Sequence, residues 1–74
     1  MQGVLISGRI SHVVADMQDQ SPVCLFRVGN IRCRALDSLA ELIIGHQGYA
    51  RHTVRIEGVL VGQIVNVCSL TLVD

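Results

Sequence analysis

Residues 22–35 read Pro-Val-Cys-Leu-Phe-Arg-Val-Gly-Asn-Ile-Arg-Cys-Arg-Ala, in which the pair Gly29-Asn30 separates two runs of alternating apolar and polar residues. This pattern predicts a β-hairpin with a two-residue turn. The turn fixes the register, so that Arg27 lies directly across from Arg32 and diagonal to Arg34 on the same face. Because like charges placed opposite each other destabilise a sheet, we expect an anion or an acidic partner over this face.

The cationic side chains are unusual in kind. The chain has six arginines and no lysine. A guanidinium group is planar and makes bidentate contacts with phosphate or carboxylate, which a lysine ammonium does not. The formal net charge is zero and the pI is about 6.8, so the molecule has no general basic field. Nucleic-acid binding would therefore rest on a local patch and would be weak and salt-sensitive.

Alternation with a period of two also predicts strands outside the hairpin. A first strand is expected over Val4–Val14, and Gly8 in its interior indicates a bulge or a tight bend. Two more strands are expected over Val54–Val61 and Ile64–Val73, and a bulge near Cys68-Ser69 would reconcile the two phases of the last one. In the hairpin itself, six side chains are expected to point inward: Cys24, Phe26, Val28, Ile31, Cys33 and Ala35.

One helix is predicted between the third and fourth strands. Ser38-Leu39-Ala40-Glu41 matches a capping box, and Gly45 is a typical stop. Polar residues predict loops over 16–21 and 46–52, and Gly62-Gln63 predicts a tight turn.

Three strands, a short helix and two strands match the order of the OB-fold, a five-stranded Greek-key barrel. We therefore predict an all-β fold with one short helix and a single domain over residues 1–74. A small open-sheet α+β domain is the alternative. Closure is favoured because uncovered sheet edges in so apolar a chain would invite aggregation.

The chain is more apolar than one small core requires. Half of its residues are hydrophobic and the mean hydropathy is +0.49. A domain of this size buries only about three fifths of its unfolded surface. We therefore expect a homo-oligomer, with a dimer as the simplest form. The expected contact surface consists of Leu5, Val23, Leu25, Val59 and Val61.

Several segments resemble known proteins. The run Val4-Leu5-Ile6-Ser7-Gly8-Arg9-Ile10 is similar to the opening strand of the bacterial single-stranded-DNA-binding protein family. Phe26-Arg27-Val28 resembles the second strand of that family, and Val54-Arg55-Ile56-Glu57-Gly58-Val59-Leu60 resembles the fourth. The tail Leu70-Thr71-Leu72-Val73-Asp74 is similar to the closing strand of the primosomal replication protein N family, which has a dimeric OB-fold. The resemblance implies single-stranded DNA binding in replication or restart, carried by basic and aromatic residues on strands two to four and their loops.

The expected binding residues are five strand arginines and two residues of the 46–52 loop. Tyr49 could stack on a base or could anchor the loop to the barrel, and both interpretations stay open. Phe26 has inward phase and is expected in the core. The full set is Arg9, Arg27, Arg32, Arg34, Arg55, Tyr49 and Arg51.

No enzyme, metal site or cofactor is expected. The acidic residues form no evident catalytic pair, and the three histidines lack nearby ligands in the sequence. Three widely spaced cysteines predict small buried thiols in a reducing cytoplasm. The start of the sequence shows no signal-peptide pattern, so a soluble cytoplasmic protein is expected. The alternative function is a protein-interaction or assembly module that uses the same barrel without binding nucleic acid.

Overall fold

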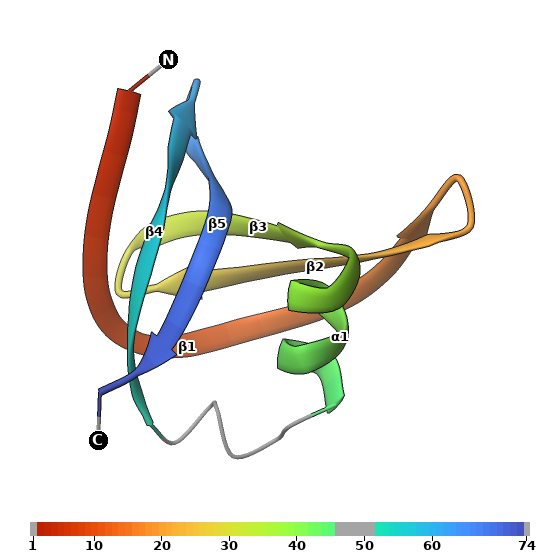
Figure 1. The fold of residues 1–74 in the computed structure, drawn as a ribbon, viewed down its shortest axis with the longest axis horizontal. Helices are drawn as coiled ribbons and strands as arrows, with labels where there is room; N and C mark the ends of the chain where they lie inside the picture. Colours follow the sequence, from red (N-terminus) through yellow and green to blue (C-terminus); the bar gives the residue numbers. More distant parts are fainter. Residues whose placement is uncertain (1, 46–51, 74) are drawn as a thin grey trace.

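One long strand, β1 (Gln2–Gln18), takes part in both halves of the sheet. Its first half pairs antiparallel with β4 (Thr53–Val61), and its second half pairs antiparallel with β2 (Ser21–Val28). Figure 1, a view of the computed structural model, shows the strand bending between these halves. At the bend, a Cβ on Gly8 would lie 2.9 Å from Cγ1 of Val28, so glycine allows the close approach. The structure describes residues 2–45 and 52–73.

The remaining strands close the sheet into a ring. β3 (Ile31–Leu36) pairs antiparallel with β2 and parallel with β5 (Ile64–Leu72), which in turn pairs antiparallel with β4. The strand order is therefore β1-β2-β3-β5-β4, with β4 back against β1. A helix, α1 (Asp37–Gly45), connects β3 to the segment that leads into β4. This arrangement is that of the OB-fold, so the predicted fold class is confirmed.

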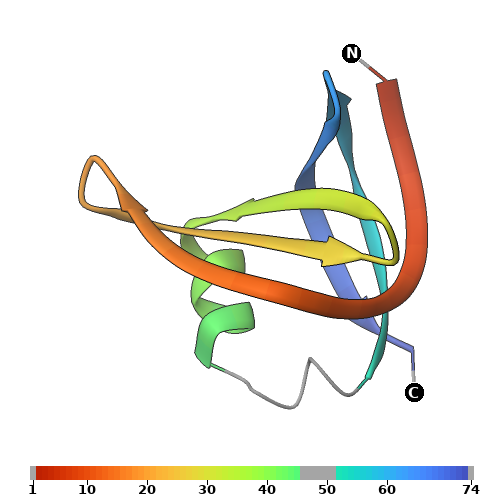
Figure 2. The ribbon, with the colours of Figure 1, turned by 180° about the vertical axis from the view of Figure 1, so that it is seen from behind.

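Three two-residue turns join consecutive strands. Gly29 and Gly62 have φ values of 61° and 63° and begin the turns after β2 and β4, as predicted. The third turn is Asp19-Gln20, where both residues have positive φ. The predicted loop over 16–21 is wrong, because β1 continues to Gln18 and β2 begins at Ser21. Strand pairing needs only backbone hydrogen bonds, so exposed polar residues can continue the β1–β2 ladder. The two strands extend beyond α1 as an arm, which Figure 2 shows from behind.

Two bulges interrupt the ladders. In β1 the register shifts between Ser11 and Val14, with His12 at a φ of 56°. Of the two alternatives expected at Gly8, the structure therefore has the bend there, and the bulge lies a few residues later. In β5 the partners of Glu57 and Gly58 are Ser69 and Val67, which leaves Cys68 as the extra residue. The bulge predicted near Cys68-Ser69 is confirmed, and it explains why the apolar phase of β5 changes there.

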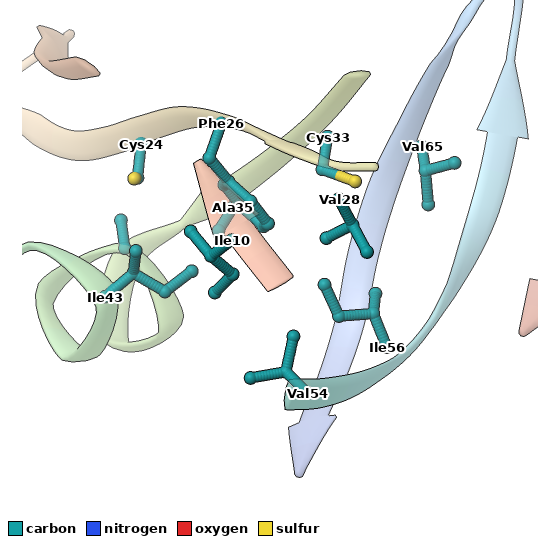
Figure 3. Packing of buried hydrophobic residues seen from close by; sticks show 11 residues of the cluster. Ile10, Cys24, Phe26, Val28, Cys33, Ala35, Ile43, Val54, Ile56 and Val65 are labelled. Atoms are coloured by element: carbon teal, nitrogen blue, oxygen red, sulfur yellow. The ribbon is translucent and has the colours of Figure 1, made fainter. Parts of the chain in front are cut away.

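The core lies between the strands and α1, which contributes Ala40 and Ile43. Figure 3 shows side chains from several strands turned toward this common interior. Five of the six hairpin residues expected to point inward are buried, whereas Ile31 has the predicted phase but is 40% exposed. Ile31 directly follows the turn at an open end of the barrel. The described core cluster consists of Ile10, Cys24, Phe26, Val28, Cys33, Ala35, Ala40, Ile43, Val54, Ile56 and Val65.

Candidate nucleic-acid interface

Three arginines define a surface on the outer side of β2 and β3, which we call the arginine face: Arg27, Arg32 and Arg34. Arg27 and Arg32 are cross-strand partners, as the turn predicts, and both are exposed. Arg34 is half-buried and lies two residues along β3 on the same side. Within residues 2–45 and 52–73, no ion pair joins any of these guanidinium groups to a carboxylate. In the described part of the subunit, the charges of Arg27 and Arg32 therefore have no paired carboxylate, whereas Arg34 shares a surface depression with Asp16 of β1.

One guanidinium group is held in place by an amide. Nη2 of Arg34 donates a hydrogen bond of 2.5 Å to Oε1 of Gln18 on β1. Arg34 is opposite Leu25 and Gln18 is opposite Ser21, so this bond runs across β2 over the position of Val23. Val23 is only 5% exposed, and its predicted place in an open contact surface is wrong. The long side chains above it exclude solvent from a residue on the outer side of the strand.

The floor between the arginines is apolar. Leu25 lies across from Val14 on one side and from Arg34 on the other. Leu25 is 39% exposed and Val14 is 54% exposed, while Ile64 of β5 is half-buried beside Arg32. Leu25 was expected in an oligomer contact, but the register places it within the arginine face.

Two surface depressions are lined in part by these apolar residues. The first, of about 320 Å³, is lined by Arg27 and Arg32, and the second, of about 300 Å³, by Arg34. Leu25 and Ile64 line both depressions, so the two lie side by side and are together called the track. The track therefore combines guanidinium groups with apolar surface over a span of several residues.

The other two described arginines lie around the bend of β1. Arg55 is exposed on β4 across from Ser7, and Arg9 is exposed on β1 across from Thr53, which makes the two arginines diagonal neighbours. Arg9 is in turn diagonal to Arg27 in the β1–β2 register. Figure 1 shows that β1 turns between its halves. Arg9 and Arg55 belong to the β1–β4 ladder, whereas the arginine face lies on β2 and β3.

Among the described residues, no exposed aromatic side chain lies on the arginine face, although Phe26 borders the first depression from the core. Phe26 is 2% exposed and belongs to the core, as expected. The other aromatic residue, Tyr49, and its neighbour Arg51 lie outside the described residues. The described groups that could contact a base on this face are apolar side chains, guanidinium planes and the imidazole of His12.

Sequence analysis did not place His12 near this site. His12 lines the first depression beside Arg27 and Arg32, and its Nδ1 lies 3.0 Å from Oγ of Ser11. The bulge in β1 sets this position, and the bulge depends on pairing with β2. Gln18 was missed for the same reason, since its partner Arg34 is sixteen residues away in the sequence.

The thiols do not form a reactive centre. Cys24 and Cys33 are buried, and burial raises the pKa of the Cys33 thiol to about 11. Burial also raises the pKa of Cys24, so both thiols are protonated at neutral pH. Cys68 is exposed in the β5 bulge, and its predicted burial is wrong. Among the described residues, no group of histidine, cysteine and acidic side chains could hold a metal ion.

The expected oligomer contact surface included four residues besides the buried Val23. Of these, Leu5 and Val61 are 60% and 47% exposed. Val59 is half-buried, and Leu25 belongs to the arginine face. In the described part of the chain, no helix has the length and apolar character needed to cross a membrane.

Comparison of the chain with protein-family models, with curated proteins and with solved structures gave no match in any of the three. The fold and the surface therefore define the class of protein, which is a five-stranded OB-fold barrel with an arginine face on β2 and β3. The resemblance to single-stranded-DNA-binding proteins stays a prediction.

Proposed function

We propose that this protein binds single-stranded nucleic acid, with single-stranded DNA in replication or DNA maintenance as the expected setting. The observation that carries the proposal is the direct opposition of Arg27 and Arg32, with no carboxylate paired to either group in the described chain. A phosphate chain over β2 and β3 would remove the repulsion between them.

The binding mode follows from the chemistry of the face. Guanidinium groups would hold phosphates by bidentate hydrogen bonds and would release bound counterions. The apolar floor of Leu25, Val14 and Ile64 would contact bases, and guanidinium planes can stack on them. Hydrophobic contact and stacking do not depend on base identity, so recognition would be non-specific in sequence. Two or more subunits would strengthen weak contacts by avidity.

The test is a titration of fluorescent oligo-dT at low and moderate salt. We expect saturable binding that weakens steeply as salt rises. Arg32→Ala combined with Arg34→Ala should reduce the slope of log K against log salt by about 1.4, because each lost phosphate contact on a single strand contributes about 0.7. Ser69→Ala, on an exposed part of β5 opposite Glu57, is the control. It should change neither the affinity for oligo-dT nor the salt slope. Unchanged binding in the double variant would refute the assignment to the arginine face.

A second candidate function is a protein-interaction or assembly module. The observation that favours it is the exposure of apolar side chains, among them Leu5 and Met17 at 60% and 61%. In that case the arginines would pair with acidic residues of a partner protein. Absence of oligo-dT binding at low salt, together with a stable oligomer, would support this second function.

A further inference from the structure

The barrel has an apolar pocket at the end that α1 does not cover, and we propose that it holds one unstacked base of the bound strand. This inference rests on the proposed function and names a base-binding site outside the arginine face. The pocket has a volume of about 450 Å³ and is called the barrel-end pocket below. Its volume falls within the range of about 300–1,000 Å³ that is usual for ligand sites.

Three segments that are distant in the sequence form the barrel-end pocket. The first half of β1 provides Val4 and Ile6, and β4 provides Leu60 across the ladder from β1. The turns after β2 and β4 complete the rim. In Figures 1 and 2 the β4–β5 turn lies at one end of the barrel and α1 lies toward the other. The helix therefore leaves these side chains uncovered, and Val4, Ile6 and Leu60 are only half-buried.

The rim is polar, and none of its described residues is acidic. Asn30 and Gln63 are exposed turn residues that line the pocket, and each side-chain amide has both donors and an acceptor. Such groups can match the polar edge of any base, whereas the apolar walls would contact its faces. An aliphatic side chain from a partner would leave these amides without a matching group.

Arg32 connects the barrel-end pocket to the arginine face. It lines both this pocket and the first depression on the face. A phosphate held by Arg32 would therefore place the adjoining nucleotide at the pocket entrance. This continuity favours a base of the same strand over an unrelated small molecule. It also supplies an apolar base contact on a barrel whose described aromatic residue, Phe26, is buried.

The experiment compares oligo-dT with an abasic oligonucleotide of equal length, which keeps the phosphates and removes the bases. At low salt, we expect oligo-dT to bind at least about fivefold more tightly than the abasic strand. Ile31→Ala, at a pocket residue that is 40% exposed, should reduce this ratio and leave abasic binding unchanged. Leu72→Ala, at a residue that is 45% exposed on β5 and outside the pocket, should preserve the ratio.

Amide chemical shifts provide a measurement that needs no variant. Signals from Asn30, Gly62 and Gln63 should move on addition of oligo-dT and should stay in place with the abasic strand. Equal affinity for the two oligonucleotides would overturn the inference and the base contacts proposed for the apolar floor, but would leave strand binding through the phosphates intact. A preference for oligo-dT that Ile31→Ala does not alter, with no shifts at these turns, would place the base elsewhere and also overturn it. Failure of both oligonucleotides to bind would refute the proposed function and the inference together.

Discussion

At the scale of single residues, Gly58 shows how one position sets the shape of the barrel. It lies on β4 directly across from the bulge in β5. A Cβ at this position would collide with the carbonyl oxygen of Asn66 and would lie 2.8 Å from Cγ1 of Val65. The backbone oxygen cannot rotate away as a side chain could, so the two strands can approach this closely only at a glycine.

We therefore expect Gly58→Ala to lower the free energy of unfolding by about 1–3 kcal/mol through overpacking. Gly3→Ala is the matched control, because Gly3 lies on the adjacent strand β1 with no heavy atom within 4 Å of its would-be Cβ. It should change stability by no more than about 0.5 kcal/mol. Urea unfolding of both variants measures the difference. Equal stability of the two variants would show that the strands separate here more easily than the packing indicates.

At the scale of elements, the β1–β2 arm has a turn with strained backbone. Asp19 and Gln20 have φ values of 51° and 67°, in the left-handed region that side chains with a Cβ disfavour. In a two-residue hairpin turn whose central residues both have positive φ, asparagine and glycine are the preferred residues. The other two tight turns have glycine at their positive-φ position.

Gln20→Gly should raise the free energy of unfolding by about 0.5–1 kcal/mol, because the relief of backbone strain exceeds the extra entropy of glycine in the unfolded chain. Asn30→Gly is the control, since Asn30 has no positive φ to relieve and should gain nothing. Thermal or urea unfolding monitored by circular dichroism gives both values. A loss of stability in Gln20→Gly would mean that the arm turn is not held in this conformation in solution.

At the scale of the whole molecule, the described surface carries a large amount of apolar area. Eleven large hydrophobic side chains are exposed, from both halves of β1 to the end of β5. A monomer of 8.0 kDa with this surface should self-associate. We therefore expect light scattering to give at least twice the chain mass at micromolar concentration.

Two residues with matched exposure test where the contact lies. Leu5→Ser should shift the oligomer toward monomer, because Leu5 is 60% exposed and belongs to the expected contact surface. Met17→Ser, at a residue that is 61% exposed on the arm, should leave the mass unchanged. A monomeric wild-type protein would contradict the oligomer. If only Met17→Ser lowers the measured oligomer mass, the subunit contact lies on the arm.

Prediction from the sequence succeeded where the determining interaction is local. The two-residue turn at Gly29-Asn30 fixes the pairing of Arg27 with Arg32, and both facts are confirmed. The change of apolar phase in β5 likewise identified the bulge at Cys68. It failed for Val23 and Ile31, whose phase along the strand is right but whose exposure depends on neighbours from other strands.

The sequence by itself determined the order of strands and helix, the tight turns after β2 and β4, and the face on which each hairpin arginine lies, because alternation and turn geometry act over a few residues. Only the tertiary structure decided the length of the arm, the bulge at His12, the hydrogen bond between Arg34 and Gln18, and the barrel-end pocket. These features come from pairing between residues that are far apart in the chain. The alternation pattern of one strand contains no information about which distant side chain will cover it or leave it open.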